Sequence, residues 1–208
     1  MGIQPWERRV KSGSDKPSED IGALDWDALE ERIRQCTRCD LAQSRTQAVP
    51  GVGNRQAEWM IVGEAPGAEE DKKGEPFVGR AGKLLDKMLK AIGLAREAVY
   101  ITNIVKCRPP NNRDPLPGEI AACKPYLERQ IALLQPRIIL AVGRIAAQSL
   151  LETKSNLGAL RGKRFHYDQT SIPVVVTYHP AYLLRAPIEK RKAWEDLVFA
   201  RRLFEENA

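Results

Sequence analysis

Four short, almost uninterrupted apolar runs recur along this chain of 208 residues and constrain its fold more than any other feature. They are Trp59–Gly63, Val99–Val105, Arg137–Val142 and Ile172–Tyr178. Runs that do not alternate between apolar and polar residues are typical of strands buried on both faces, as in a parallel sheet. Helical patterns occupy Ala81–Ile92, Pro117–Leu134, Ile145–Leu151 and Ala186–Glu206. We therefore predict an α/β fold, a three-layer α/β/α sandwich with a central four-stranded parallel sheet and right-handed crossovers.

The amino-terminal segment has a different character. Residues 1–24 are polar, contain Gly, Ser, Pro and Lys without periodicity, and are predicted to be a disordered tail. From Asp25, a residue suited to a helix N-cap, the sequence DWDALEERIRQC has helical spacing, with Trp26, Leu29 and Ile33 on one face. We predict one folded domain over residues 25–208.

The net charge of +6 favours a polyanionic partner. Nucleic acid is the commonest such partner, although many basic proteins bind none. No apolar run approaches the roughly 18 residues of a membrane span. Met1–Val10 lacks the apolar stretch of a signal peptide. We expect a cytoplasmic protein without membrane contact.

Polar side chains occur where three of the predicted strands end. Glu64 follows the first strand, Asn103 lies late in the second and His179 follows the fourth. Ligands of open α/β sheets bind beyond the carboxyl ends of the strands, so these residues are candidates for one site. A lone Asn or His at a strand end is otherwise most often a satisfied structural residue.

The segment GEAPGAEEDKKGEPFVGRAG, from Gly63 to Gly82, leaves the first strand and opens a helix. It holds several acids, and Phe77 stands alone in its polar, Gly-rich loop. A surface loop with solvated charges is one interpretation. The other interpretation is a ligand site, with a catalytic carboxylate at Glu64 and an aromatic stacking surface at Phe77.

The segment YHPAYLLR, from Tyr178 to Arg185, contains Leu183 and Leu184 in a predicted short loop before Arg185. Exposed leucines beside an arginine suit a wedge that enters a base step while the arginine holds phosphate. They suit equally the hydrophobic contact at the start of the last helix.

Four cysteines are spaced as C-x2-C and C-x15-C, at Cys36, Cys39, Cys107 and Cys123. In a reducing cytosol such a number more often binds a metal or a cluster than forms disulfides. Four thiolates can hold a zinc ion or a 4Fe–4S cluster. A second C-x2-C would favour a zinc ribbon, and the wide second pair favours the cluster slightly.

Together these segments resemble the family 4 uracil-DNA glycosylases, the iron–sulfur branch of that superfamily, over roughly Leu29 to Ala200. The family's GE-x-PG, acidic and PFVG-x-AG motif is similar to residues 63–82, its TN-x-VKCRPP motif to Thr102–Pro110, and its HP-x-YLLR motif to His179–Arg185. The resemblance implies an enzyme that flips uracil out of single- or double-stranded DNA and hydrolyses its N-glycosidic bond at the start of base excision repair. We expect it to be a monomer.

The resemblance also implies residue roles. Glu64 would position the attacking water, and His179 would donate a hydrogen bond to uracil O2. Ala65 would line the uracil site, Glu70 would lie beside C5 and help to exclude the methyl group of thymine, Phe77 would stack on the base and Asn103 would bind its O4 and N3 edge. Leu183 would fill the space left by the flipped nucleotide, with Arg185 on DNA. Cys36, Cys39, Cys107 and Cys123 would bind a 4Fe–4S cluster.

One position departs from this pattern, and other functions stay possible. Related enzymes often have Ser after the His-Pro pair, where this chain has Ala181, so a hydroxyl contact to phosphate would be missing. The alternatives are a non-catalytic iron–sulfur module that binds DNA and a zinc-stabilised α/β protein acting on a small nucleotide. The covalent histidine trap of a related branch is not indicated, because KCRPPNNRDP after Val105 has no histidine.

Overall fold

The computed structural model describes residues 20–206, and within this range the strands form one six-stranded sheet in the order β1-β3-β2-β4-β6-β5. The four inner strands are parallel, and the edge strands β1 and β5 run antiparallel to their neighbours. The strand bounds are β1 Val52–Gly53, β2 Trp59–Gly63, β3 Tyr100–Asn103, β4 Ile138–Val142, β5 Phe165–His166 and β6 Pro173–Thr177.

The predicted strands are the four inner strands, so the central four-stranded parallel sheet is confirmed. The sequence does not predict β1 and β5. Each has only two residues, and a period of two cannot be recognised in so short a segment.

Helices fill the other segments. The α-helices are α1 Trp26–Arg34, α2 Leu41–Ser44, α3 Ala68–Lys73, α4 Arg80–Ala91, α5 Pro117–Leu134, α6 Arg144–Leu150, α7 Leu157–Leu160, α8 Pro180–Arg185 and α9 Lys190–Glu206. Short 3-10 helices are η1 Ile21–Ala23, η2 Arg96–Ala98, η3 Pro110–Asn112 and η4 Pro187–Glu189. Asp25 caps α1 as predicted, since its carboxylate accepts the backbone N–H of Ala28 at 2.9 Å. Between residues 20 and 206, none of the helices has the length and apolar character needed to span a membrane.

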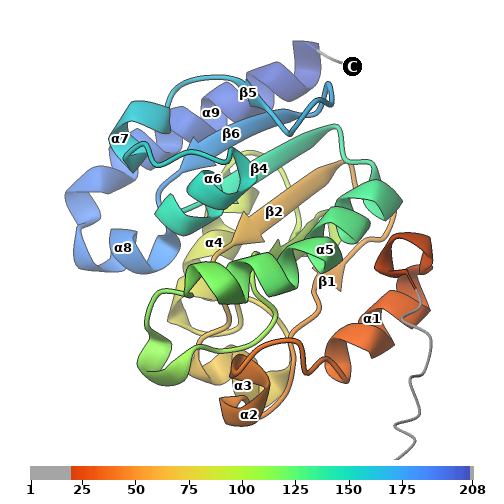
Figure 1. Cartoon of the computed structure of the whole chain (residues 1–208). Helices are drawn as coiled ribbons and strands as arrows, with labels where there is room; N and C mark the ends of the chain where they lie inside the picture. Colours follow the sequence, from red (N-terminus) through yellow and green to blue (C-terminus); the bar gives the residue numbers. More distant parts are fainter. Residues whose placement is uncertain (1–19, 207–208) are drawn as a thin grey trace, which may run out of the picture.

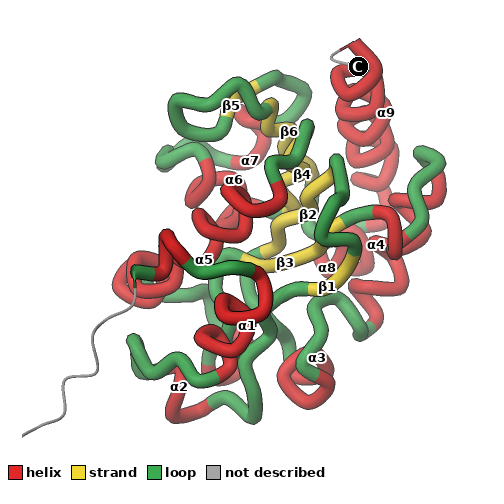
Figure 2. The backbone as a smooth tube through the Cα atoms, turned by 90° about the vertical axis from the view of Figure 1, so that its right-hand side faces the viewer, coloured by secondary structure: helices red, strands yellow, loops and turns green. Residues whose placement is uncertain are grey.

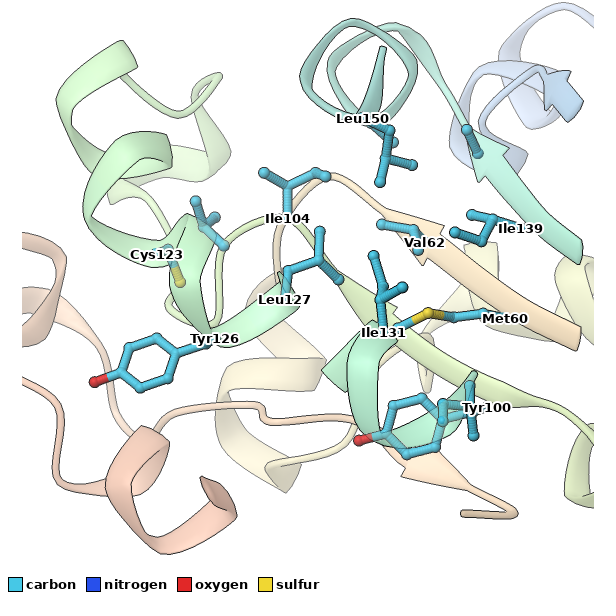
Figure 3. Packing of buried hydrophobic residues seen from close by; sticks show 14 of the residues in the cluster. Met60, Val62, Tyr100, Ile104, Cys123, Tyr126, Leu127, Ile131, Ile139 and Leu150 are labelled. Atoms are coloured by element: carbon cyan, nitrogen blue, oxygen red, sulfur yellow. The ribbon is translucent and has the colours of Figure 1, made fainter. Parts of the chain in front are cut away.

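Alternate residues of each strand face opposite helical layers. Met60 and Val62 pack with α1, α5 and α6, whereas Trp59 and Ile61 pack with α4 and α9. Figure 1 shows α1 and α5 in front of the sheet and α4 behind it. Figure 2 shows the strands between the two layers, and Figure 3 shows the core on the α5 face. This arrangement is the predicted three-layer sandwich.

The predicted boundary of the tail at residue 24 is wrong. Ile21 and Leu24 are buried against the core, and η1 begins at Ile21 after its N-cap Asp20, whose carboxylate accepts the backbone N–H of Gly22. The carbonyl of Leu24 accepts a hydrogen bond from Arg129 on α5 at 2.6 Å. A segment this short has no periodicity that would reveal it. Residues 1–19 of the predicted tail lie outside the described residues.

The predicted last helix, Ala186–Glu206, begins later than expected. Residues 187–189 form η4, and α9 starts only at Lys190. Before it, Leu183 and Leu184 lie in the separate helix α8 and not in a loop. Pro187 explains the break, because a proline disfavours the helical conformation in the residue before it, and Ala186 has φ −126° and ψ 72°.

Candidate active site

A cavity of about 440 Å³ opens beyond the carboxyl ends of β2 and β3 and beside the start of α8. It brings together seven predicted site residues from three segments of the chain. They are Glu64, Ala65, Glu70, Phe77, Asn103, His179 and Arg185. The expectation that strand ends converge on one site is therefore met, because parallel strands end at the same edge of the sheet.

Asn103 lies at the floor of this cavity, and Gly63 is its neighbour on the adjacent strand. They are the last paired residues of the β2–β3 ladder. A Cβ atom on residue 63 would collide with Oδ1 of Asn103 and lie 2.6 Å from Cζ of Phe77, so only glycine leaves room for both side chains. Asn103 is 1% exposed, and its Oδ1 has no hydrogen-bond partner within residues 20–206. A buried acceptor without a donor is costly, so this atom is suited to a ligand N–H.

Phe77 provides the aromatic wall. Its ring is buried and stacks with the imidazole of His179, with ring centroids 5.6 Å apart and planes inclined by 29°. Its backbone has a φ of 54°, which a residue with a Cβ adopts only when its surroundings hold it there. Gly82 allows this conformation, since a Cβ atom there would overlap the carbonyl of Phe77.

Glu70 holds the loop around Phe77 in place. Its carboxylate accepts the backbone N–H groups of Gly67 at 3.1 Å, Val78 at 2.9 Å and Gly79 at 3.0 Å. These bonds connect the start of α3 to the residues that directly follow Phe77. Glu70 thus has a structural role that the sequence did not predict, in addition to lining the cavity.

His179 is held as a neutral imidazole. Its Nδ1 accepts the backbone N–H of Ala181 at 3.1 Å, which leaves Nε2 to carry the proton. Burial, reinforced by the nearby cation of Arg185 and opposed by Glu70, lowers the pKa of His179 to about 4. Ala181 has no side-chain hydroxyl, and its backbone N–H, the donor that it could still offer to a DNA phosphate, is already used by His179.

Glu64 is half-buried and directly follows the carboxyl end of β2. Its burial and the neighbouring carboxylate of Asp114 raise its pKa to about 7, while Arg144 acts in the opposite direction. Arg144 and Asp114 form an ion pair at 2.6 Å. The backbone carbonyl of Glu64 accepts the N–H of Val105 at 3.1 Å, which ties this residue to the turn after β3. Such a carboxylate exchanges its proton near neutral pH.

Leu183 is not where the wedge hypothesis requires it. Its side chain is 1% exposed and packs in the apolar cluster with α4, because the helix α8 turns this position inward. The prediction that Leu183 is an exposed leucine is therefore wrong. The exposed apolar side chains of α8 are Tyr182 and Leu184, at 38% and 37%. Tyr182 also lines the cavity.

Asp114 and its neighbours are site residues that the sequence did not single out. Asn112, Arg113 and Asp114 line the same cavity as Phe77. Asn111 and Asn112 both have a φ of 54°, so this loop makes two left-handed steps. The run NNRDP is a turn signal, but no strand precedes it closely enough to indicate that it returns to the site.

The four cysteines meet in a second, small cavity beside α5. Cys36 and Cys39 follow α1, Cys107 follows β3 and Cys123 lies in α5, and all four line this cavity. N–H groups point at their sulfur atoms: Arg38 N to Cys36 at 3.5 Å, Arg45 Nη1 to Cys107 at 2.8 Å and Lys106 N to Cys123 at 3.3 Å.

This donor set suits a thiolate-bound group. The four cysteines are free of disulfides, and burial is the largest cause of the raised thiol pKa at Cys39, Cys107 and Cys123. A metal that replaces the thiol protons compensates the negative charge of the buried thiolates, so burial no longer disfavours the deprotonated sulfurs. The N–H···S hydrogen bonds also favour the charged form. In the described part of the chain no three His, Cys, Asp or Glu side chains are grouped as ligands of one metal ion.

The fold and the cavity define a three-layer α/β protein whose site lies beyond the ends of its parallel strands. The comparison with protein families makes this specific. The chain belongs to the uracil DNA glycosylase superfamily, whose family model matches residues 50–198.

The chain is also similar to individual uracil-DNA glycosylases. A type-4 uracil-DNA glycosylase of Archaeoglobus fulgidus is 48% identical over 167 residues, covering 77% of this chain and 84% of the relative. One of Sulfurisphaera tokodaii is 49% identical over 182 residues, covering 84% and 83%. One of Thermotoga maritima is 46% identical over 158 residues, covering 76% and 82%.

Proposed function

We propose that this chain is a uracil-DNA glycosylase that flips uracil out of DNA and hydrolyses its N-glycosidic bond, the first step of base excision repair. Membership of the superfamily and the names of the similar proteins agree with this function. The observation that carries it is the buried Oδ1 of Asn103, which has no donor among residues 20–206 and lies at the floor of a cavity with an aromatic wall.

The chemistry of Asn103 matches the edge of uracil. Its Oδ1 accepts from N3–H, and its Nδ2 donates to O4. Cytosine presents an acceptor at N3 and a donor at N4, so both contacts would become repulsive. A site whose buried polar groups are left unpaired rejects such an analogue strongly. In this proposal Phe77 stacks on the base, Ala65 lines the uracil site, and Glu70 lies beside C5 and helps to exclude the methyl group of thymine.

Cleavage breaks the bond between C1′ of the sugar and N1 of uracil. The bonding electrons leave with uracil, whose negative charge reaches O2, and the sugar becomes oxocarbenium-like. Nε2–H of His179 donates to O2 and stabilises this anion without giving up its proton. Glu64 as a carboxylate stabilises the sugar cation, orients water toward C1′ and accepts the water proton. Preorganised charged and hydrogen-bonding groups of this kind often contribute more to the rate of an enzyme than any other effect.

The cysteines are proposed to hold a 4Fe–4S cluster through the thiolates of Cys36, Cys39, Cys107 and Cys123. When bound, the cluster supplies structural cross-linking, because the reacting bond needs no metal. The type-4 names of the similar proteins are consistent with a cluster, and the four cysteines that line one cavity support a thiolate-bound group there.

DNA binding is proposed at the rim of the cavity. Arg185 lines the cavity and offers a cation for phosphate, and the exposed Tyr182 and Leu184 lie on the same helix. A flipped base costs a few kcal/mol of stacking and pairing, which such contacts offset. We also propose that the protein acts as a cytoplasmic monomer on single- or double-stranded DNA.

A uracil-containing oligonucleotide tests the proposal directly. The purified protein is incubated with a single strand and a duplex that each contain one uracil, and alkali then cuts at any abasic site. We expect a cut at the uracil position, none in the thymine oligonucleotide, and loss of cutting in Asn103→Ala. Asn54→Ala is the matched control, because Asn54 is exposed next to the amino end of β3. Uracil-dependent binding without cutting would instead support the non-catalytic DNA-binding module.

A further inference from the structure

Lys106 is a buried lysine inside the β3–α5 region and has no part in the mechanism above. It is 1% exposed. Its ammonium Nζ donates to Thr102 Oγ1 at 2.7 Å, to the backbone carbonyl of Asn103 at 2.6 Å and to Gln130 Oε1 at 2.7 Å. The three donors of the ammonium are thus all used, and one of them fixes the backbone of the residue proposed to bind uracil.

The backbone of Lys106 belongs to the cysteine cavity. Its N–H donates to Cys123 Sγ at 3.3 Å, its carbonyl accepts the N–H of Val49 at 2.8 Å, and Cys107 is the next residue. Lys106 also lines the cavity where the four cysteines meet. One residue therefore contacts both the cysteine cavity and Asn103.

The groups that accept hydrogen bonds from the Lys106 ammonium carry no negative charge. All three acceptors of Nζ are neutral oxygens, and no carboxylate in residues 20–206 forms an ion pair with it. A buried cation is costly unless an anion lies nearby. The cysteines are the neighbouring groups that can supply this negative charge, since thiolates are deprotonated when they bind a metal group.

We propose that Lys106 is the positioning residue for Asn103, coupling the cysteine cavity to the part of the site that distinguishes bases. Its ammonium holds the carbonyl of Asn103 and the hydroxyl of Thr102, so the Asn103 amide stays aimed at the cavity floor. This inference rests on the proposed function, because it requires that Asn103 contact uracil. A residue that merely fills the core would affect stability and every ligand alike.

A double-mutant cycle separates these two roles. Wild type, Lys106→Met, Asn103→Ala and the double variant are compared as iron-loaded proteins. Affinity is measured for a duplex with 2′-fluoro-deoxyuridine, which resists hydrolysis, and for the same duplex with an abasic analogue. We expect Lys106→Met to weaken binding of the uracil analogue about tenfold, as for loss of a hydrogen bond to a charged group. In the Asn103→Ala background it should have no further effect, and abasic binding should change less than twofold.

Controls keep the test decisive. Lys124→Met removes an exposed lysine from α5 and should change neither affinity. Iron content and melting temperature are measured for every variant. If Lys106→Met loses its iron, Thr102→Val takes its place, because it deletes one acceptor of Nζ and keeps the charge. It should show a smaller loss of the same kind.

Three results would overturn the inference. In the first, Lys106→Met, or Thr102→Val in its place, weakens binding of the uracil analogue equally in the wild-type and Asn103→Ala backgrounds. Lys106 would then act independently of Asn103. Equal losses on the uracil and abasic duplexes would show a general structural role. If Asn103→Ala alone binds the uracil analogue as tightly as wild type, the proposed role of Asn103 fails first, and that of Lys106 falls with it.

Discussion

Gly63 and Asn103 face each other at the end of the β2–β3 ladder, and the amide of Asn103 occupies the space that any side chain at residue 63 would need. The absence of a side chain at one strand end thus creates the place for the polar group at the other. Because both residues lie on central strands, neither can move away without disturbing the sheet.

Gly63→Ala should therefore weaken uracil recognition while the protein remains folded. The new methyl group would push Asn103 and Phe77 out of their positions, so we expect at least about a tenfold loss of affinity for a uracil analogue in DNA, the equivalent of one lost hydrogen bond to a tightly held group. Affinity for abasic DNA serves as the internal control. Unchanged uracil affinity would mean that Asn103 does not bind the base from this position.

Glu64→Gln should lower the single-turnover rate by roughly two decades, as for other groups that stabilise charge at a reacting centre, and leave DNA affinity intact. Since the pKa of Glu64 is raised to about 7, the wild-type rate should rise with pH through 7 and level off above it. Rates measured from pH 5.5 to 9 should show this rise in wild type and not in the variant. Asp114→Asn should move the midpoint of the pH–rate curve to lower pH, and Arg144→Met should move it to higher pH. If both variants move it in the same direction, these two charges do not set the pKa of Glu64.

The same shift has a consequence for stability. A carboxyl group whose pKa is higher in the folded than in the unfolded protein contributes stability below its unfolded pKa, near 4.5, and loses it as the pH rises through 7. Glu64→Gln should therefore raise the melting temperature at pH 8 and have little effect near pH 5. A stabilisation that does not depend on pH would point to a packing effect.

His179 should be the neutral Nε2–H tautomer at pH 7, with a pKa of about 4. Nuclear magnetic resonance of the imidazole nitrogens reports both properties. Arg185→Met removes a cation that disfavours the imidazolium form, so the pKa of His179 should rise while the tautomer stays the same. The other histidine, His166, provides the reference signal. An Nδ1–H tautomer would contradict the donor role at uracil O2.

Leu183 and Leu184 should behave differently although they are adjacent. Leu183→Ala removes a buried side chain and should lower the free energy of unfolding by about 2–4 kcal/mol, with equal harm to activity on a U·A pair and on single-stranded uracil DNA. Leu184→Ala removes an exposed one and should leave the melting temperature unchanged. If Leu184 enters the duplex, its loss should slow cleavage of the U·A pair more than that of the single strand. Equal rates for Leu184→Ala and wild type on both substrates would leave Tyr182 as the exposed apolar candidate of α8.

The sequence predicted those parts of the fold in which several residues repeat one pattern. Trp59–Gly63 and the three other apolar runs are long enough to indicate strands, and Glu64, Asn103 and His179 could then be placed at their ends. The exposure of Leu183 was predicted incorrectly because α8 has only six residues, too few for an apolar pattern to repeat at helical spacing. Asp114 and the three hydrogen bonds of Glu70 depend on how loops fold back in space, which no local pattern contains.

The four cysteines also join parts of the chain that are far apart in sequence. Cys36 and Cys123 are 87 positions apart. A group bound by both would act as a cross-link, and closing a loop of this length lowers the entropy of the unfolded chain enough to favour folding by about 4.6 kcal/mol. Removal of iron should therefore free the segment around α1 first, and limited proteolysis should cut there before it reaches the sheet.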